Sequence, residues 1–337
     1  MSIHFQRTAV PALAVALLNS PVLSPVLAHE IVGNRFFPAT LGIDDPGVND
    51  ELSLPTYDAF KTGDTPPIRQ SDLSSEFSKR ITEDFAISLG STYTWLSPPA
   101  GTDGNGARGF QNLETTFKYR IFKNAEHEFV ASVGLGVEWG RTGSMDVGAE
   151  EFNTYVPTFY FGKGFGDLPD SVGWLQPFAI TGQAGYAMPG QRSKTTFSLD
   201  PDSGDISADT EVHPDVLQWG WSVQYSMPYL KSAVVALGLP EFINHLIPLV
   251  EGTFQTPVAH TITSGTITTG TINPGVIWVG NYFQIALEAT VPINRQSGTG
   301  VGFIGQLHFY LDDIDPRGIG RPIFGSAVQP ASPFARN

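Results

Sequence analysis

The chain has 337 residues with 19 basic and 33 acidic side chains, so its formal charge is −14, and it contains no cysteine. This acidic balance argues against nucleic acid as a partner. A chain without cysteine must be held together by a core or a sheet network rather than by disulfides. Aromatic residues make up 12% and charged residues 15% of the chain, alongside 36 glycines and 26 prolines. This profile is typical of a β-rich chain with many turns and excludes a disordered one.

The first 28 residues have the pattern of a secretory signal peptide. Arg7 precedes the apolar run TAVPALAVALLNSPVLSPVLA, and cleavage after Ala28 makes His29 the first residue of the mature chain. An amino-terminal histidine can chelate a transition metal, but the pattern favours an ordinary chain end at His29. No later segment offers about 18 uninterrupted apolar residues, so no transmembrane helix is expected.

From residue 72 onward, segments of about ten residues alternate in polarity and are separated by turn residues. In the segment 113–121, Phe117 and Tyr119 fall on one parity, whereas Glu114 and Lys118 fall on the other. A strand with a side-chain period of two therefore has one apolar and one charged face. Similar segments occupy 85–95, 129–139, 217–225 and 283–294, and less regular ones 73–82, 152–164, 173–189, 246–258, 270–279 and 299–312. These patterns predict eleven strands.

The links between these segments alternate in length. ED at 83–84 and GN at 280–281 are short, whereas SPPAGTDGNGARG at 97–109 and the acidic link at 190–215 are long. Short turns at one end and longer loops at the other are typical of bacterial outer-membrane barrels. The link 230–242 lies at the short-turn end and is expected to form a small helix. Aromatic residues gather near both ends of the strands, as the two belts of a membrane barrel require.

The sequence therefore predicts an all-β fold, namely a transmembrane antiparallel up-and-down β-barrel of about 12 strands in the bacterial outer membrane. Short periplasmic turns and longer extracellular loops are expected. The charged face of segment 113–121 then lines an aqueous lumen, because lysine or arginine at the bilayer midplane costs about 2–4 kcal/mol in such barrels.

Residues 73–313 are assigned to the barrel and 314–337 to a periplasmic tail. Eleven strands would start the chain outside the cell, and bacterial barrels have even strand numbers. One ascending strand is therefore expected within 29–72, at 31–43 or after Pro66. Alternatively, this segment enters the lumen as a plug and the strand count differs.

The charged residues on the polar parity are the candidate pore-lining set. They are Glu76, Arg80, Glu114, Lys118, Arg120, Glu128, Glu138, Glu251, Glu288 and His308. One interpretation is a charged constriction that selects solutes by mixed-sign fields. The other is a set of ion pairs that brace the barrel wall.

Catalytic and metal sites have little support in the sequence. His308 has no adjacent serine, and no G-x-S-x-G motif occurs, so no catalytic residue is assigned. The acidic loop resembles a calcium ligand string through Asp200, Asp202, Asp205 and Asp209, but it lacks the spacing of a true calcium loop. We expect a solvated loop there, bridged at most by divalent cations of the outer leaflet, and we assign no cofactor and no metal centre.

The segments QPFAITGQAGY, LVEGTFQTPV, GTINPGVIW and ALEATVPINRQSGTGVGFIGQLHFYLDD resemble outer-membrane transporters related to the phenol meta-pathway degradation family. The resemblance covers roughly 73–312. It implies an outer-membrane channel for small, often aromatic or apolar, compounds, and no functional residue set carries over from it.

The leading hypothesis is a non-enzymatic outer-membrane channel or transporter whose partners are lipid and a small solute. The alternative is a lipase-like enzyme or a scaffold that uses the barrel as an anchor and has a plugged lumen. A serine–histidine contact on neighbouring strands would favour the enzyme. The solute and the oligomeric state are left open.

Overall fold

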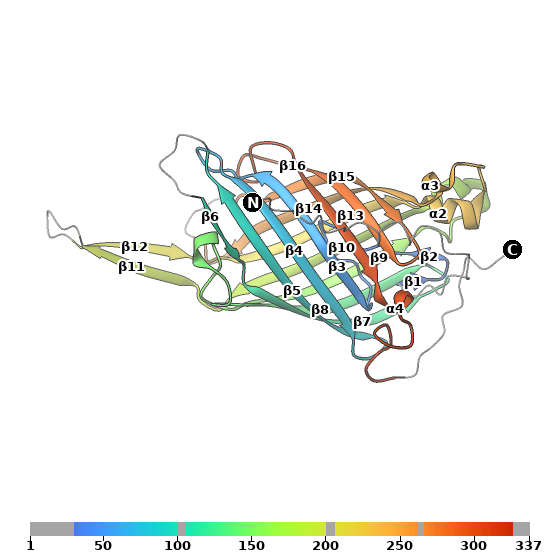
Figure 1. Ribbon diagram of the computed structural model, residues 1–337, viewed down its shortest axis with the longest axis horizontal. Helices are drawn as coiled ribbons and strands as arrows, with labels where there is room; N and C mark the ends of the chain where they lie inside the picture. The colour runs from blue at the N-terminus through green and yellow to red at the C-terminus, as the bar shows by residue number, and fades with distance from the viewer. Residues whose placement is uncertain (1–29, 100–105, 200–205, 262–265, 326–337) are drawn as a thin grey trace, which may run out of the picture.

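The computed structural model describes residues 30–99, 106–199, 206–261 and 266–325. Within these residues, twelve antiparallel strands form a closed barrel (Figure 1). They are β3 (Glu51–Lys61), β4 (Arg69–Arg80), β5 (Phe85–Ser97), β7 (Leu113–Asn124), β8 (Phe129–Trp139), β9 (Thr154–Gly164), β10 (Phe178–Pro189), β13 (Asp215–Tyr225), β14 (Leu246–Ala259), β15 (Thr269–Val279), β16 (Phe283–Pro292) and β17 (Gly302–Tyr310). Each strand pairs with its neighbours in chain order, and β17 pairs with β3 to complete the circle. The predicted fold class is confirmed.

The remaining elements lie at the two ends of the barrel. The hairpin of β11 (Ser193–Leu199) and β12 (Ile206–Val212) projects beyond the long-loop end, where a loop was expected, and β6 (Ala107–Phe110) extends the sheet beside β5. The other elements are β1 (Ile31–Val32), β2 (Arg35–Phe36), η1 (Met145–Val147), η2 (Asp170–Leu175), α2 (Met227–Tyr229), η3 (Leu230–Val234), α3 (Glu241–Asn244) and α4 (Leu311–Ile314). The predicted helical link 230–242 contains η3 and the start of α3. No helix in the described part of the chain is long and apolar enough to cross a membrane.

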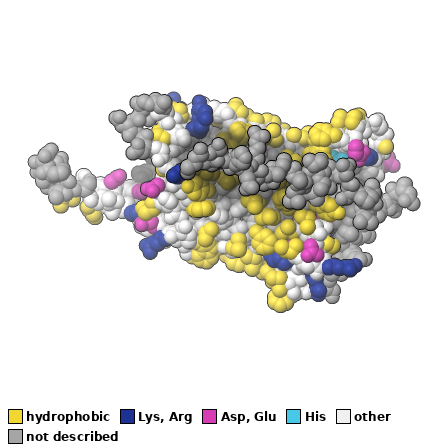
Figure 2. All heavy atoms as spheres, in the orientation of Figure 1, with side chains coloured by type: hydrophobic (Ala, Val, Ile, Leu, Met, Phe, Trp, Pro, Cys, Tyr) yellow, Lys and Arg dark blue, Asp and Glu magenta, His cyan; other side chains and the backbone are white. Residues whose placement is uncertain are grey.

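The two faces of each strand differ as the sequence predicted. On β8, Val133 and Leu135 of one parity are each 40% exposed. Val130 and Ser132, of the other parity, are fully buried. Figure 2 shows hydrophobic side chains spread over the outer surface of the barrel. The apolar parity therefore faces outward and the polar parity inward, which is the arrangement of a membrane barrel and the reverse of a soluble sandwich.

The first strand of the barrel is β3, at 51–61, so the predictions of a barrel strand at 31–43 or of a separate one after Pro66 are wrong. The run after Pro66 belongs to β4, and the barrel begins at Glu51 rather than at residue 73. In β3 the register shifts between Ser53 and Thr56, so its side chains do not follow a clean two-residue period. The predicted signal peptide and residues 326–337 of the predicted tail lie outside the described residues.

If the apolar parity faces lipid, a charged side chain placed on it should destabilise the barrel more near the middle of the membrane than at its edge. Leu135 pairs with Phe117 near the middle of the wall, whereas Phe129 begins its strand at the short-turn end. We expect Leu135→Arg to lower the free energy of unfolding by about 2–4 kcal/mol, with a smaller loss for Phe129→Arg. Urea unfolding of the barrel in lipid vesicles measures both values. Equal losses at the two positions would contradict a membrane environment.

Candidate functional site

Residues 30–50, which we call the plug, fill the short-turn half of the lumen. After the small hairpin of β1 and β2, the plug reaches the middle of the barrel and returns to the start of β3. Its apolar side chains Val32 and Phe37 pack with Val130 of β8 and Ala179 of β10. The sequence posed a strand and a plug within 29–72 as alternatives, and the structure contains both.

Two strand glycines make room for the plug. A Cβ atom at Gly162 would lie 2.9 Å from the Phe37 ring, and a Cβ at Gly220 would collide with the Ile43 side chain. These glycines let the plug approach the wall closely at both places. The fit therefore depends on small residues in strands that are far from the plug in the sequence.

Arg35 forms the most buried ion pair between the plug and the wall. Its Nε lies 3.2 Å from Glu128 Oε2, with both side chains at most 4% exposed. The guanidinium also donates to the carbonyls of Pro177, at 2.9 Å, and Gln176, and it lies over the Tyr229 ring. Burial and the nearby Glu128 carboxylate raise the pKa of the Tyr229 phenol. Arg35 thus anchors the plug with its donors shared among several acceptors.

Two further basic residues predicted for the pore bind plug acids. Lys118 Nζ lies 2.6 Å from Asp44 Oδ2, and Arg120 lies 2.6 Å from Glu30 Oε2. Lys118 is only 6% exposed. Both side chains face the lumen, but they bind the plug and do not line an open, water-filled passage. Replacing them with glutamate would therefore disturb the plug as well as any ion selectivity.

Two more predicted residues bind the plug at other depths along the lumen. Arg80 Nε lies 2.7 Å from Asp50 Oδ2 at the short-turn end. In the middle of the barrel, Glu251 Oε2 accepts hydrogen bonds from the backbone amides of Leu41, at 3.0 Å, and Gly42, at 2.6 Å. The plug is thus tied to opposite parts of the wall.

The remaining predicted residues lie apart from these contacts. Glu76, Glu114 and His308 line a cavity above the plug. Glu138 accepts from the Asn112 side chain at 2.9 Å, and Glu288 is buried at 1% exposure. The set therefore divides into plug anchors, cavity-lining groups, and the two residues Glu138 and Glu288, which lie in neither group.

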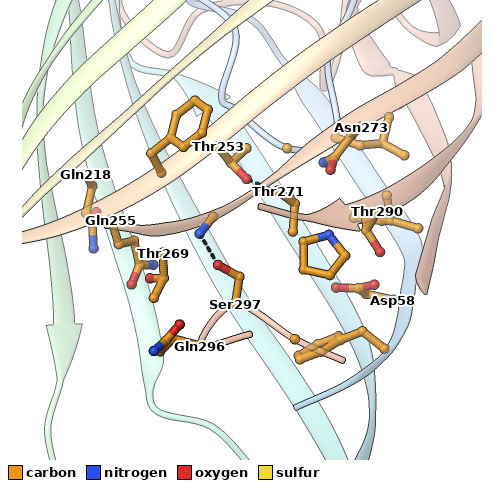
Figure 3. Close-up of a pocket in the computed structure, with 18 of the residues that line it drawn as sticks. Asp58, Gln218, Thr253, Gln255, Thr269, Thr271, Asn273, Thr290, Gln296 and Ser297 are labelled. Carbon is orange, nitrogen blue, oxygen red and sulfur yellow. Dashed lines mark hydrogen bonds between the residues drawn. The ribbon is translucent and has the colours of Figure 1, made fainter. Parts of the chain in front are cut away.

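The vestibule is the space above the plug, formed by two adjoining cavities of about 570 Å³ and 420 Å³. Both are lined by Asp58 and by Leu41 and Gly42 at the tip of the plug. In the larger cavity, threonine, glutamine, asparagine and serine side chains from several strands converge (Figure 3). Gln296 and Ser297 belong to the long-loop end, so the vestibule extends to that end of the barrel.

Sequence reasoning missed part of the lumen lining. Asp58 and Asp72 line the smaller cavity, as does Ser53. Asp72 lies on the same parity as Glu76 in β4, so extending the predicted strand to residue 69 would have found it. The acidic run DDPGVND at 44–50 signalled the plug acids, but nothing local identified their partners.

Among the described residues, no cluster of three or more histidine and acidic side chains could hold a metal ion. His29 and the loop acids Asp200, Asp202 and Asp205 lie outside the described residues, whereas Asp209 lies on β12.

Similarity to known proteins is limited to the fold. No family model and no curated protein matches the sequence. Among solved structures, the chain resembles the NanC porin (10% identity, 76% of this chain and 98% of that chain, TM-score 0.41). It also resembles the β domain of the Bordetella autotransporter Brka (12%, 78% and 99%, 0.44) and LpxR from Salmonella typhimurium (11%, 77% and 99%, 0.40). At TM-scores of 0.40–0.44 these likenesses say nothing about function, which must be argued from the lumen.

Proposed function

We propose that the protein is an outer-membrane channel for small polar solutes, closed by its own N-terminal plug. The observation that carries this proposal is the position of the plug tip, where Leu41 and Gly42 form the floor of a vestibule that extends to the long-loop end. A solute from outside would enter the vestibule and stop at this floor. Passage then requires the plug to move.

The plug is held in a way that permits movement without opening the barrel. Its strands β1 and β2 pair only with each other, and no backbone ladder joins them to the barrel sheet. The plug is bound instead by side-chain ion pairs and single hydrogen bonds such as those of Arg35 and Glu251. The wall therefore keeps all of its strand pairing when the plug moves.

Spontaneous opening should be rare. Breaking one buried ion pair without replacing its partner costs about 3–5 kcal/mol, and the Arg35–Glu128 pair is nearly inaccessible to solvent. The closed state should therefore dominate until a stimulus offsets these contacts.

The lining favours polar solutes. Hydroxyl and amide side chains such as Thr271 and Gln255 line the larger cavity together with the apolar Phe60 and Ile304, and Asp58 supplies a carboxylate. The resemblance to the phenol meta-pathway degradation family points instead to aromatic or apolar compounds. The vestibule chemistry supports hydrogen-bonding solutes, because polar groups that line a passage replace the hydration of what they bind.

A disulfide that locks the plug tests the channel directly. A Cβ at Gly42 would lie 2.8 Å from Thr253 Cγ2, so cysteines at these positions can reach each other, and the chain has no other cysteine. We expect the oxidised Gly42→Cys/Thr253→Cys variant to show no opening events in planar bilayers. Reduction should restore the openings of the wild type. Gly42→Cys alone is the matched control and should not respond to oxidant.

A variant without residues 30–48 should conduct continuously, because it lacks the floor of the vestibule. Undiminished openings in the oxidised double-cysteine variant would show that the plug is not the gate. Absence of conductance in the deletion variant, once heat modifiability shows that it is folded, would contradict a channel altogether.

We propose ester hydrolysis as a second candidate function, because the structure contains the serine–histidine contact that distinguishes it. Ser53 Oγ lies 2.9 Å from His308 Nδ1, and His308 Nε2 lies 3.3 Å from Glu51 Oε2. All three residues line the smaller cavity. A serine hydrogen-bonded to a histidine, with a carboxylate near the other ring nitrogen, resembles the arrangement of acyl-transfer nucleophiles. The histidine would take the Ser53 proton as its oxygen attacks an ester carbonyl.

A fluorophosphonate probe tests this second candidate, since it labels only activated serines. We expect mass spectrometry to find the label on Ser53 of the folded wild type and none after Ser53→Ala. Ser75→Ala, at another serine of the same cavity, should leave the labelling unchanged. An unlabelled Ser53 in the wild type would leave its contact with His308 as a structural hydrogen bond.

A further inference from the structure

One belt of the barrel wall carries buried polar side chains on four consecutive strands. Ser222 on β13 pairs with Glu251 on β14, and Glu251 pairs with Asn273 on β15. Gly275, two residues beyond Asn273, pairs with Glu288 on β16. Directly paired residues have Cβ atoms about 4.5–5.5 Å apart. The belt therefore brings two carboxylates and an amide together.

These side chains are almost completely buried. Ser222 and Glu251 are 0%, Glu288 is 1% and Asn273 is 3% exposed. Gly275 leaves space for Glu288, because a side chain at residue 275 would collide with it. Asn273 borders the larger cavity of the vestibule, where Figure 3 shows it near Thr271 and Thr290. The cluster is therefore enclosed by the wall, and Asn273 is its one member that borders a vestibule cavity.

Among the described residues, Glu288 Oε1 and Oε2, Asn273 Oδ1 and Ser222 Oγ have no hydrogen-bond partner outside the cluster. Within it, the Glu288 carboxyl group lies within reach of the Asn273 and Glu251 side chains. One carboxylate oxygen of Glu251 accepts the two plug amides of Leu41 and Gly42. Within the described part of the chain, no lysine, arginine or histidine forms an ion pair with Glu251 or Glu288. The site therefore has an excess of acceptors and a deficit of positive charge.

Two buried carboxylates in contact cannot both stay ionised without a counter-charge. Either one of them holds a proton or a cation lies between them. An all-oxygen set of two carboxylates and an amide carbonyl matches the preference of calcium, which accepts six to eight oxygen ligands in flexible geometry. Magnesium demands a stricter octahedron. The vestibule can supply water for the remaining positions.

We propose that Glu251, Asn273 and Glu288 form a calcium site in the barrel wall beside the plug tip. The ion neutralises the two carboxylates and fixes the Glu251 side chain, whose second oxygen binds Gly42 of the plug. Calcium thereby stabilises the closed plug. The binding site itself does not depend on the channel function and holds even if the barrel never conducts.

Equilibrium dialysis of the folded full-length barrel with radioactive calcium tests the site. We expect one buried calcium per chain in the wild type, and at least a tenfold loss of affinity in Glu288→Gln and in Asn273→Ala. Asn273→Ala removes a ligand without changing charge, so it serves if Glu288→Gln fails to fold. Glu114→Gln removes a lumen carboxylate on β7 outside the cluster and should keep wild-type affinity.

Calcium bound by the acidic segment 200–209 would be unaffected by Glu288→Gln, so equal affinity in wild type and variant would overturn the proposal. Absence of calcium binding in the wild type would also overturn it. An infrared band of a protonated carboxyl that disappears in Glu288→Gln would then show that the pair shares a proton instead.

Discussion

The pairing of β17 with β3 is the contact on which the rest of the structure depends. The two strands pair from Phe303 with Ala59 to Tyr310 with Glu51 and close the barrel. In hydrocarbon, every backbone polar group must find its partner within the protein, so an open sheet edge is not viable. Because the circle is closed, the outer surface can be largely apolar in its membrane-facing band, and most polar side chains of the wall face the lumen.

That confinement creates the need for the plug. A narrow lumen lined by Lys118, Arg120 and Glu128 holds charges that are largely removed from water, and such charges need partners. The plug supplies Glu30, Asp44 and Arg35 at the matching positions. Of the two interpretations of the lumen charges, braces and selective constriction, the short-turn half supports the first. The vestibule acids Glu76 and Glu114 line an open cavity instead, and a selective role for them stays a prediction.

The fold could be predicted from the sequence because its signals are local. The two-residue alternation in segments such as 113–121 and the alternation of link lengths need no knowledge of distant residues. The strand β3 escaped prediction because its register shift breaks that alternation. The hairpin of β11 and β12 lies in a link whose polar composition resembled a loop.

The site could be predicted only in part, since its contacts join residues far apart in the chain. Parity identified Arg120, Glu251 and His308 as lumen residues, but the partner of Glu251 is 209 residues away at Gly42. His308 meets Ser53 across the closing strand pair, 255 residues apart. No local pattern encodes such contacts. The contact of His308 with Ser53 forms only when the first and last strands of the barrel pair.

Hydrogen exchange of the plug measures its occupancy of the lumen most directly. The amides of Leu41 and Gly42 donate to Glu251 in the middle of the barrel, so peptides covering 36–48 should exchange slowly for the folded protein in lipid vesicles. We predict protection approaching that of β14, and much greater than that of the exposed β11–β12 hairpin. Exchange as fast as in this hairpin would show that the plug does not occupy the barrel.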